Sequence, residues 1–214
     1  SVVSATSCAR RRLIRDVRPT QMRPLYAQAK QSLLLSCPES VFRAQTVSEW
    51  VGAFDLPQPV ANYYAELGPV DVYIPGYGNP YFLPSLASLW KFQAGYRYHS
   101  ETFERFDVWD DDWLVIADEG GDAFIYSRGD TTISHAYHGE GFWSPEPLFT
   151  SIEHMAACLS LMGEIADSAG LDFTDSDSFI LPCYIQTAEA RMTEVTQDLL
   201  YTERVLTRLG WLHN

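Results

Sequence analysis

The sequence lacks a metal-binding pattern of cysteine and histidine, a motif for a catalytic nucleophile and a long apolar run. Its four cysteines (Cys8, Cys37, Cys158 and Cys183) form no CxxC pair, so we expect them to be reduced and either buried or incidental. No serine lies in a GxSxG motif, and no stretch approaches the roughly 18 apolar residues of a membrane span. These absences favour a cytoplasmic protein without enzyme activity, cofactor or membrane contact.

Basic residues are scarce beyond the first 30 positions. The 214-residue chain has a net charge of −13, but residues 1–30 hold seven Lys or Arg and a single acid. Residues 31–214 hold eight basic and 27 acidic side chains, a net charge of −19. Such a surface repels phosphate, so we expect neither nucleic acid nor an anionic membrane as ligand. A basic protein is the partner that this charge favours.

The stretch Trp113–Ser127 predicts a central β-hairpin. Two short runs rich in β-branched and aromatic residues flank Gly120 and Gly121, which can adopt positive φ in a tight turn. Neither run alternates with polar residues, which indicates strands that are buried on both faces. A third apolar run over Thr131–Tyr137 follows another turn, so the three strands are expected to form a meander.

Apolar residues with helical spacing predict several helices around this meander. Gly68 and Gly170 are placed to end two of them, and Thr46 to Glu49 forms a capping box. The expected helices cover residues 21–36, 59–67, 84–92, 151–169 and 187–209, with an edge strand over 179–185. The fold class is therefore α+β, a mainly antiparallel central sheet flanked by helices, with additional N-terminal and C-terminal helices. We expect a basic N-terminal arm and helix (1–45), an α+β domain (46–170) and a C-terminal extension with a long helix (171–214).

The densest acidic region runs from Glu101 to Asp122, where nine carboxylates face only one basic residue, Arg105. The spacing fits no calcium-binding loop, so a recognition face for a basic partner and an ordinary solvated surface remain the main alternatives. Aromatic residues beside acids are suited to protein contacts. The predicted partner-binding residues are Trp109, Asp110, Asp111, Asp112, Glu119, Asp122, Tyr77 and Trp143, the tryptophans and the tyrosine being expected at the surface.

Two further patterns have ordinary structural explanations. His135 and His138 are three residues apart at a strand end, so their rings are expected to point to opposite faces and not to share a metal ion. The tripeptide Arg128-Gly129-Asp130 is expected to form a hairpin turn. We predict no metal ligand and no catalytic residue.

The order of the elements resembles a known family. Leu56-Pro57 precedes a helix that ends at Gly68, a helix carrying Leu86, Leu89 and Trp90 follows, and a strand-Gly-Gly-Asp-strand unit covers Val115–Tyr126. A closing helix begins at Ser151. Over about residues 46–165 this is similar to the SUKH superfamily, which contains the yeast cell-wall-synthesis regulators of the Smi/Knr type and many bacterial immunity proteins.

The resemblance implies an α+β domain without catalytic residues that binds a cognate protein toxin and blocks its action, and the acidic charge of the chain favours a basic toxin. A toxin-neutralising immunity protein is therefore the first functional prediction. A regulatory scaffold that assembles through the arm at Arg10–Arg18 and the helix Thr187–Leu209 is the alternative, and a metal-dependent hydrolase ranks third. The sequence leaves homodimer formation open.

Overall fold

The computed structural model describes residues 23–212 of the chain. The helices are α1 (Pro24–Ser36), α2 (Gln58–Glu66), α3 (Leu86–Leu89), α4 (Ile152–Ala169), α5 (Pro182–Thr196) and α6 (Leu199–Arg208). The strands are β1 (Val41–Phe42), β2 (Pro69–Val70), β3 (Val72–Ile74), β4 (Tyr81–Leu83), β5 (Trp113–Glu119), β6 (Asp122–Ser127), β7 (Ile133–Ala136) and β8 (Glu146–Phe149). The predicted basic arm over residues 1–18 lies outside the described residues.

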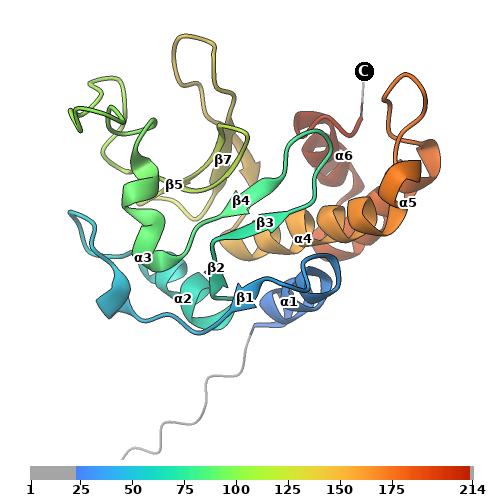
Figure 1. The fold of residues 1–214 in the computed structure, drawn as a ribbon, viewed down its shortest axis with the longest axis horizontal. Coiled ribbons are helices and arrows are strands. Elements are labelled where there is room, and N and C mark those ends of the chain that lie inside the picture. The colour runs from blue at the N-terminus through green and yellow to red at the C-terminus, as the bar shows by residue number, and fades with distance from the viewer. Residues whose placement is uncertain (1–22, 213–214) are drawn as a thin grey trace, which may run out of the picture.

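Six strands form an antiparallel sheet in the order β3-β4-β5-β6-β7-β8, so each pairs with its neighbours in sequence (Figure 1). The predicted hairpin is present, with β5 and β6 joined by Gly120 and Gly121 at φ of 59° and 106°. Positive φ at both turn positions matches the right-handed twist of paired strands. The third predicted strand is β7, and the α+β class with a mainly antiparallel sheet flanked by helices is confirmed.

The long helices pack on one face of this sheet (Figure 1). α4 is buried along most of its length, with α1 and α5 beside it. An added Cβ at Gly163 would lie 2.2 Å from Ile74 Cγ2, so glycine permits close contact between α4 and β3. One hydrophobic core contains residues from all three predicted segments, from Tyr26 in α1 to Trp211 after α6.

The opposite face of the sheet carries a second, smaller core. Its buried residues come from β5, β6 and β7 and from the connection between β4 and β5: Tyr96, Trp109, Val115, Ala123, Ile125 and Ala136. The connection therefore covers the face that the helices leave open. This explains why the central strands do not alternate between apolar and polar residues, since both of their faces are buried.

A buried glutamine attaches this connection to the sheet. β4 pairs only with the end of β5, at Asp118 and Glu119, so the start of β5 has no strand on that side. Gln93 takes the place of the missing strand, because its amide donates to the Val115 carbonyl (2.9 Å) and accepts from the Val115 N–H (3.0 Å). The backbone groups of a buried strand are thus satisfied by a side chain.

Several predicted helix ends are confirmed. Gly68 follows α2 with φ 62°, and Gly170 ends α4 with φ 54°. At the start of α4 the sequence favours Thr150 as the cap, but the cap is the next residue, Ser151, which accepts from the His154 N–H (3.2 Å). Thr46 opens a 3-10 turn instead of an α-helix, with its N–H donating to the Glu49 carboxylate (3.1 Å) as in a capping box.

The C-terminal region differs from the prediction in two ways. The expected strand over 179–185 is absent, because Pro182 occupies the first position of α5, where its missing N–H costs no hydrogen bond. The expected single helix Thr187–Leu209 is two helices, since Gln197 adopts a left-handed conformation (φ 58°) and Asp198 caps α6 through the Tyr201 N–H. The sequence pattern predicts no strand at β8.

Candidate functional site

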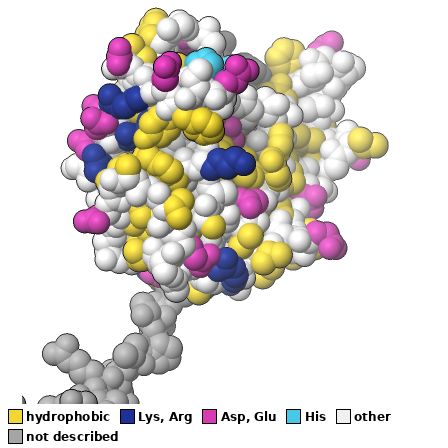
Figure 2. Space-filling view, turned by 60° about the vertical axis from the view of Figure 1, so that its left-hand side comes forward, with side chains coloured by type: hydrophobic (Ala, Val, Ile, Leu, Met, Phe, Trp, Pro, Cys, Tyr) yellow, Lys and Arg dark blue, Asp and Glu magenta, His cyan; other side chains and the backbone are white. Residues whose placement is uncertain are grey.

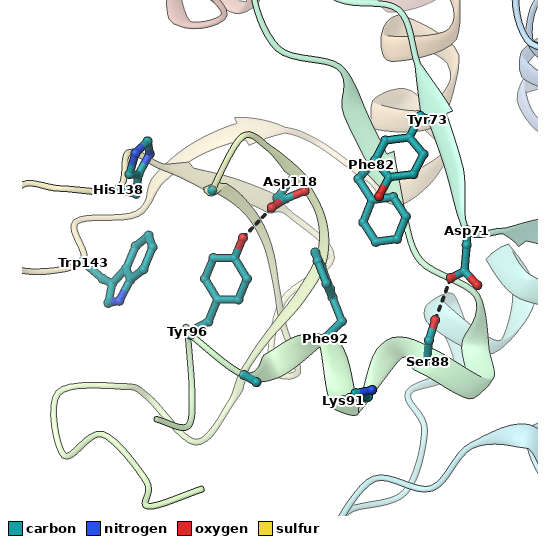
Figure 3. A pocket seen from close by; sticks show the side chains of 13 residues that line it. Asp71, Tyr73, Phe82, Ser88, Lys91, Phe92, Tyr96, Asp118, His138 and Trp143 are labelled. Atoms are coloured by element: carbon teal, nitrogen blue, oxygen red, sulfur yellow. Dashed lines mark hydrogen bonds between the residues drawn. The ribbon is translucent and has the colours of Figure 1, made fainter. Parts of the chain in front are cut away.

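An open groove of about 760 Å³ lies on the face of the sheet opposite α4. Tyr73 in β3 and Phe82 in β4 point to this face, because the residues on either side of each are buried in the main core. The connection between β4 and β5 and the loop between β7 and β8 supply the other walls (Figure 3). We call this site the aromatic groove and define it by Tyr73, Phe82, Phe92, Tyr96, Asp118 and Trp143.

The rings of the aromatic groove form a continuous series. Centroid distances are 4.7 Å between Tyr73 and Phe82, 5.4 Å from Phe82 to Phe92 and 5.7 Å from Phe92 to Tyr96. Trp143 follows, 5.5 Å from Tyr96. All of these pairs are tilted or edge-on, the arrangements that aromatic rings prefer. The wall is therefore preorganised and does not need a ligand to assemble it.

Asp118 presents its carboxylate to this wall. The Tyr96 hydroxyl donates to Asp118 Oδ2 at 2.7 Å, and Figure 3 shows this bond between the two sides of the groove. Burial raises the pKa of Asp118, and the neighbouring charge of Asp122 acts in the same direction, although the Tyr96 hydrogen bond opposes both. A partly desolvated carboxylate among aromatic rings is a strong electrostatic feature, because the surrounding apolar surface screens its charge poorly.

The rim carries polar groups that are mostly paired within the chain. His138 Nδ1 lies 2.6 Å from Asp122 Oδ1 at one end of the groove. Asp71 lies at the other end and accepts hydrogen bonds from Ser85 and Ser88, which lower the pKa of Asp71 against the effect of burial. Lys91 lines the groove as well (Figure 3).

The predicted acidic face is largely neutralised by the chain itself. Three arginines contact it, two more than the sequence indicated: Arg97, Arg105 and Arg128. Asp111 pairs with two of them at 3.3 and 2.8 Å, and Asp112 pairs with the third at 2.8 Å. Asp110 accepts from the Asp112 N–H. The trio remains exposed, but its charge is balanced and it lies outside the groove lining.

The predicted aromatic anchors occupy three different places. Trp109 is only 1% exposed, so the expectation of a surface position is wrong. Its ring packs between Trp113 and Trp143 in the second core, because the apolar face of the sheet needs a large covering residue there. Tyr77 lies away from the groove, where its hydroxyl donates to the Ser178 carbonyl (2.8 Å). Trp143 is the one predicted anchor that lines the aromatic groove.

Glu119 and Asp122 lie opposite each other across the β5–β6 ladder, beside the hairpin turn. Glu119 is next to Asp118 in β5 and therefore points to the opposite face, where it pairs across the ladder with Tyr81. Burial raises the pKa of Glu119 to about 8, with the charges of Asp122 and Asp118 adding to the shift. Among residues 23–212 its carboxylate has no hydrogen-bond donor and no ion-pair partner. Asp122 holds His138 at the groove rim.

Sequence reasoning missed most of the groove. Tyr73, Phe82, Phe92 and Tyr96 stood out only as members of an aromatic-rich span, and Asp118 only as one of nine carboxylates. Alternation of buried and open positions along β3 and β4 could have placed Tyr73 and Phe82 on one face. The contribution of Phe92 and Tyr96 depends on how the long connection folds back, which no local pattern encodes.

His135 and His138 lie on different sides of the sheet, as their spacing predicts. His135 is buried on the helix side, where the Arg208 Nε–H donates to its Nδ1 (3.0 Å), whereas His138 is exposed on the groove side. Among residues 23–212, no three His, Cys, Asp or Glu side chains are grouped as metal ligands, and no helix is long and apolar enough to cross a bilayer. No family model, curated protein or solved structure matches the chain.

Proposed function

We propose that this chain is a non-enzymatic protein-binding domain that receives its partner in the aromatic groove. The supporting observation is the series of aromatic rings around Asp118 on the face of the sheet away from α4. Aromatic side chains provide most of the affinity at protein interfaces, and they do so best where their positions are fixed beforehand. Figure 2 shows hydrophobic side chains gathered on this side of the molecule, with acidic side chains around them.

The partner that we propose is a cognate protein toxin with a basic surface, which makes the chain an immunity protein of the SUKH (Smi/Knr) type acting in the cytoplasm. The net charge of −19 over residues 31–214 supports this choice, because opposite charge accelerates the encounter of two proteins. Because arginines balance the charge of Asp110, Asp111 and Asp112, the net charge of the whole surface would set the rate of encounter. The affinity would come from the groove.

The experiment is a pull-down with the full chain as bait in lysate of the native cell, read by mass spectrometry. We expect one stoichiometric, basic partner that the double variant Tyr73→Ala/Trp143→Ala no longer retains. Leu171→Ala is the matched control, because Leu171 is fully exposed and lies outside the groove. Co-expression of the captured protein with the wild type, but not with the double variant, should protect a susceptible bacterial host.

Two results would contradict this proposal. If the double variant still retains the partner, the aromatic groove is not part of the interface. Growth of the host when the captured protein is expressed alone would show that the partner is not a toxin. Reversing the charges of Asp110, Asp111 and Asp112 together makes the surface less acidic and should slow association without changing the dissociation rate. An unchanged association rate would exclude steering by the net charge.

A regulatory scaffold is the second candidate, favoured by exposed leucines on the terminal helices. Leu34 and Leu35 at the end of α1 are 49% and 68% exposed, and Leu199 and Leu200 at the start of α6 are 49% and 76% exposed. Light scattering of the wild type and of Leu200→Lys tests it. Self-association of the wild type that the substitution abolishes would favour a homodimer or scaffold, and a monomeric wild type would exclude assembly through this contact.

A further inference from the structure

Asp118 is a groove carboxylate without a cation. Its described partners are the Tyr96 hydroxyl and the Gly121 N–H, both neutral donors. None of the ion pairs among residues 23–212 includes Asp118, although Lys91 lines the same groove. His138 is engaged with Asp122 instead. The groove therefore holds negative charge that the described part of the chain leaves unbalanced.

Elsewhere in the protein, an arginine side chain occupies places where an aromatic ring and a carboxylate lie close together. At three other places a guanidinium lies over an aromatic ring and pairs with a carboxylate: Arg97 over Trp90 with Asp111, Arg128 over Phe54 with Asp112, and Arg208 over Tyr137 with Glu146. The distances from guanidinium carbon to ring centroid are 5.6, 4.2 and 4.0 Å. Arginine suits these sites because its planar group stacks on rings while its N–H donors reach an acid.

We propose that the aromatic groove is an arginine-binding site, in which a guanidinium from the partner pairs with Asp118 and stacks on the rings of Phe92, Tyr96 and Trp143. This inference rests on the proposed function and names the chemical group that the groove recognises. The Tyr96 hydroxyl and the Gly121 N–H use two of the roughly four acceptor positions of the Asp118 carboxylate, so lone pairs remain for the incoming N–H groups. The basic surface expected of the partner supplies the arginine.

Arginine fits this groove better than lysine does. The groove is open, and its walls are flat ring faces and edges in one series, not an enclosed cage around a point. A flat guanidinium can lie against such a wall and keep its edge on the carboxylate, whereas an ammonium group would remain hydrated at the opening. Selectivity for arginine over lysine is therefore part of the proposal.

The probe is N-acetyl-arginine-methylamide, added to the full chain and followed by the indole N–H resonance of Trp143. We expect a saturable shift, at least about tenfold weaker binding of the uncharged citrulline analogue, and weaker binding of the lysine analogue. Asp118→Asn should weaken arginine binding by about tenfold or more, because the asparagine side chain carries no charge. Asp107→Asn is the matched control, since Asp107 is exposed and lies outside the groove lining.

Three outcomes would overturn the arginine site. Equal affinity for the arginine and citrulline analogues would show that the positive charge does not contribute to binding. Unchanged affinity of Asp118→Asn for the arginine analogue would show that the Asp118 carboxylate does not bind it. The third outcome concerns a variant in which five arginines are changed to glutamine: Arg10, Arg11, Arg12, Arg15 and Arg18. If only this variant binds the arginine analogue, the occupant of the groove is this chain's own N-terminal segment. The two proposals fail separately: a captured partner that Asp118→Asn retains contradicts only the arginine site, whereas failure to capture any partner contradicts the proposed function.

Discussion

Replacing Glu119 with glutamine is expected to stabilise the protein at neutral pH. Glu119 lies near the end of β5 on the helix side of the sheet, and burial together with Asp122 and Asp118 raises its pKa to about 8. The folded protein therefore keeps this side chain protonated at pH 7, whereas the unfolded chain ionises it near pH 4.5. Ionisation of the unfolded chain favours unfolding.

The size of the effect follows from the interval between these two pKa values. Below pH 4.5 both states are protonated and the side chain does not change the free energy of unfolding. From pH 4.5 to about 8, wild-type stability decreases by about 1.4 kcal/mol per pH unit, and it becomes constant above that range. At pH 7 the loss amounts to about 3 kcal/mol. Glutamine has the shape of the protonated carboxyl but cannot ionise, so Glu119→Gln avoids this loss.

Urea unfolding of both proteins at pH 4.5, 6, 7 and 8 measures the difference. Subtracting the two free energies at each pH cancels the titration of every other group that the substitution leaves unchanged. We expect a difference near zero at pH 4.5 that grows with pH. Glu140→Gln is the control, because Glu140 is exposed in the loop before β8. A difference that does not change between pH 4.5 and 8 would refute the assignment of a raised pKa to Glu119.

Three further predictions concern stability. Gly68→Ala should lower the free energy of unfolding by about 2 kcal/mol or more, because the residue has φ 62° and the new Cβ would lie 1.8 Å from the Arg43 carbonyl oxygen. Thermal unfolding measures this loss, and an unchanged Tm would contradict it. Burial, and to a smaller extent Arg208, lowers the pKa of His135 to about 4. The unfolded chain therefore binds a proton at His135 before the folded protein does, so the free energy of unfolding is unaffected above pH 6.5 and decreases as the pH falls toward 4. His135→Gln should remove that part of the urea-measured pH dependence, and an unchanged pH profile would contradict it. Trp109→Ala should lower the free energy of unfolding measured in urea by about 3 to 5 kcal/mol. A loss below about 1 kcal/mol would show that the second core does not unfold together with the rest of the protein.

Local patterns in the sequence were sufficient for the centre of the fold. The two glycines at 120 and 121 and the dense apolar runs beside them identify the hairpin, because turn geometry and strand burial are both local properties. The break at Gln197 was missed because a left-handed glutamine has no sequence signature, and the apolar spacing continues across it. Pro182 lies inside the strand expected over 179–185, but it begins a helix.

The candidate site was less predictable than the fold, for a physical reason. Charge along the sequence suggested a free acidic face at Asp110, Asp111 and Asp112, but arginines distant in the chain fold back on it. Conversely, Asp118 has no cationic partner among residues 23–212, and the sequence did not distinguish it from its neighbours. Net pairing depends on the tertiary structure, and neither composition nor spacing contains that information.

The short outer strands of the main sheet limit how other chains can join it. β3 has three residues followed by Pro75, and one of its carbonyls, that of Tyr73, accepts from the Cys37 thiol. β8 carries exposed Glu146 and Pro147, and proline has no N–H to offer. Both borders therefore resist extension by a foreign strand, which protects the protein from edge-to-edge aggregation. A partner of the main sheet is therefore expected to bind through side chains on its surface, and not by backbone pairing at its borders.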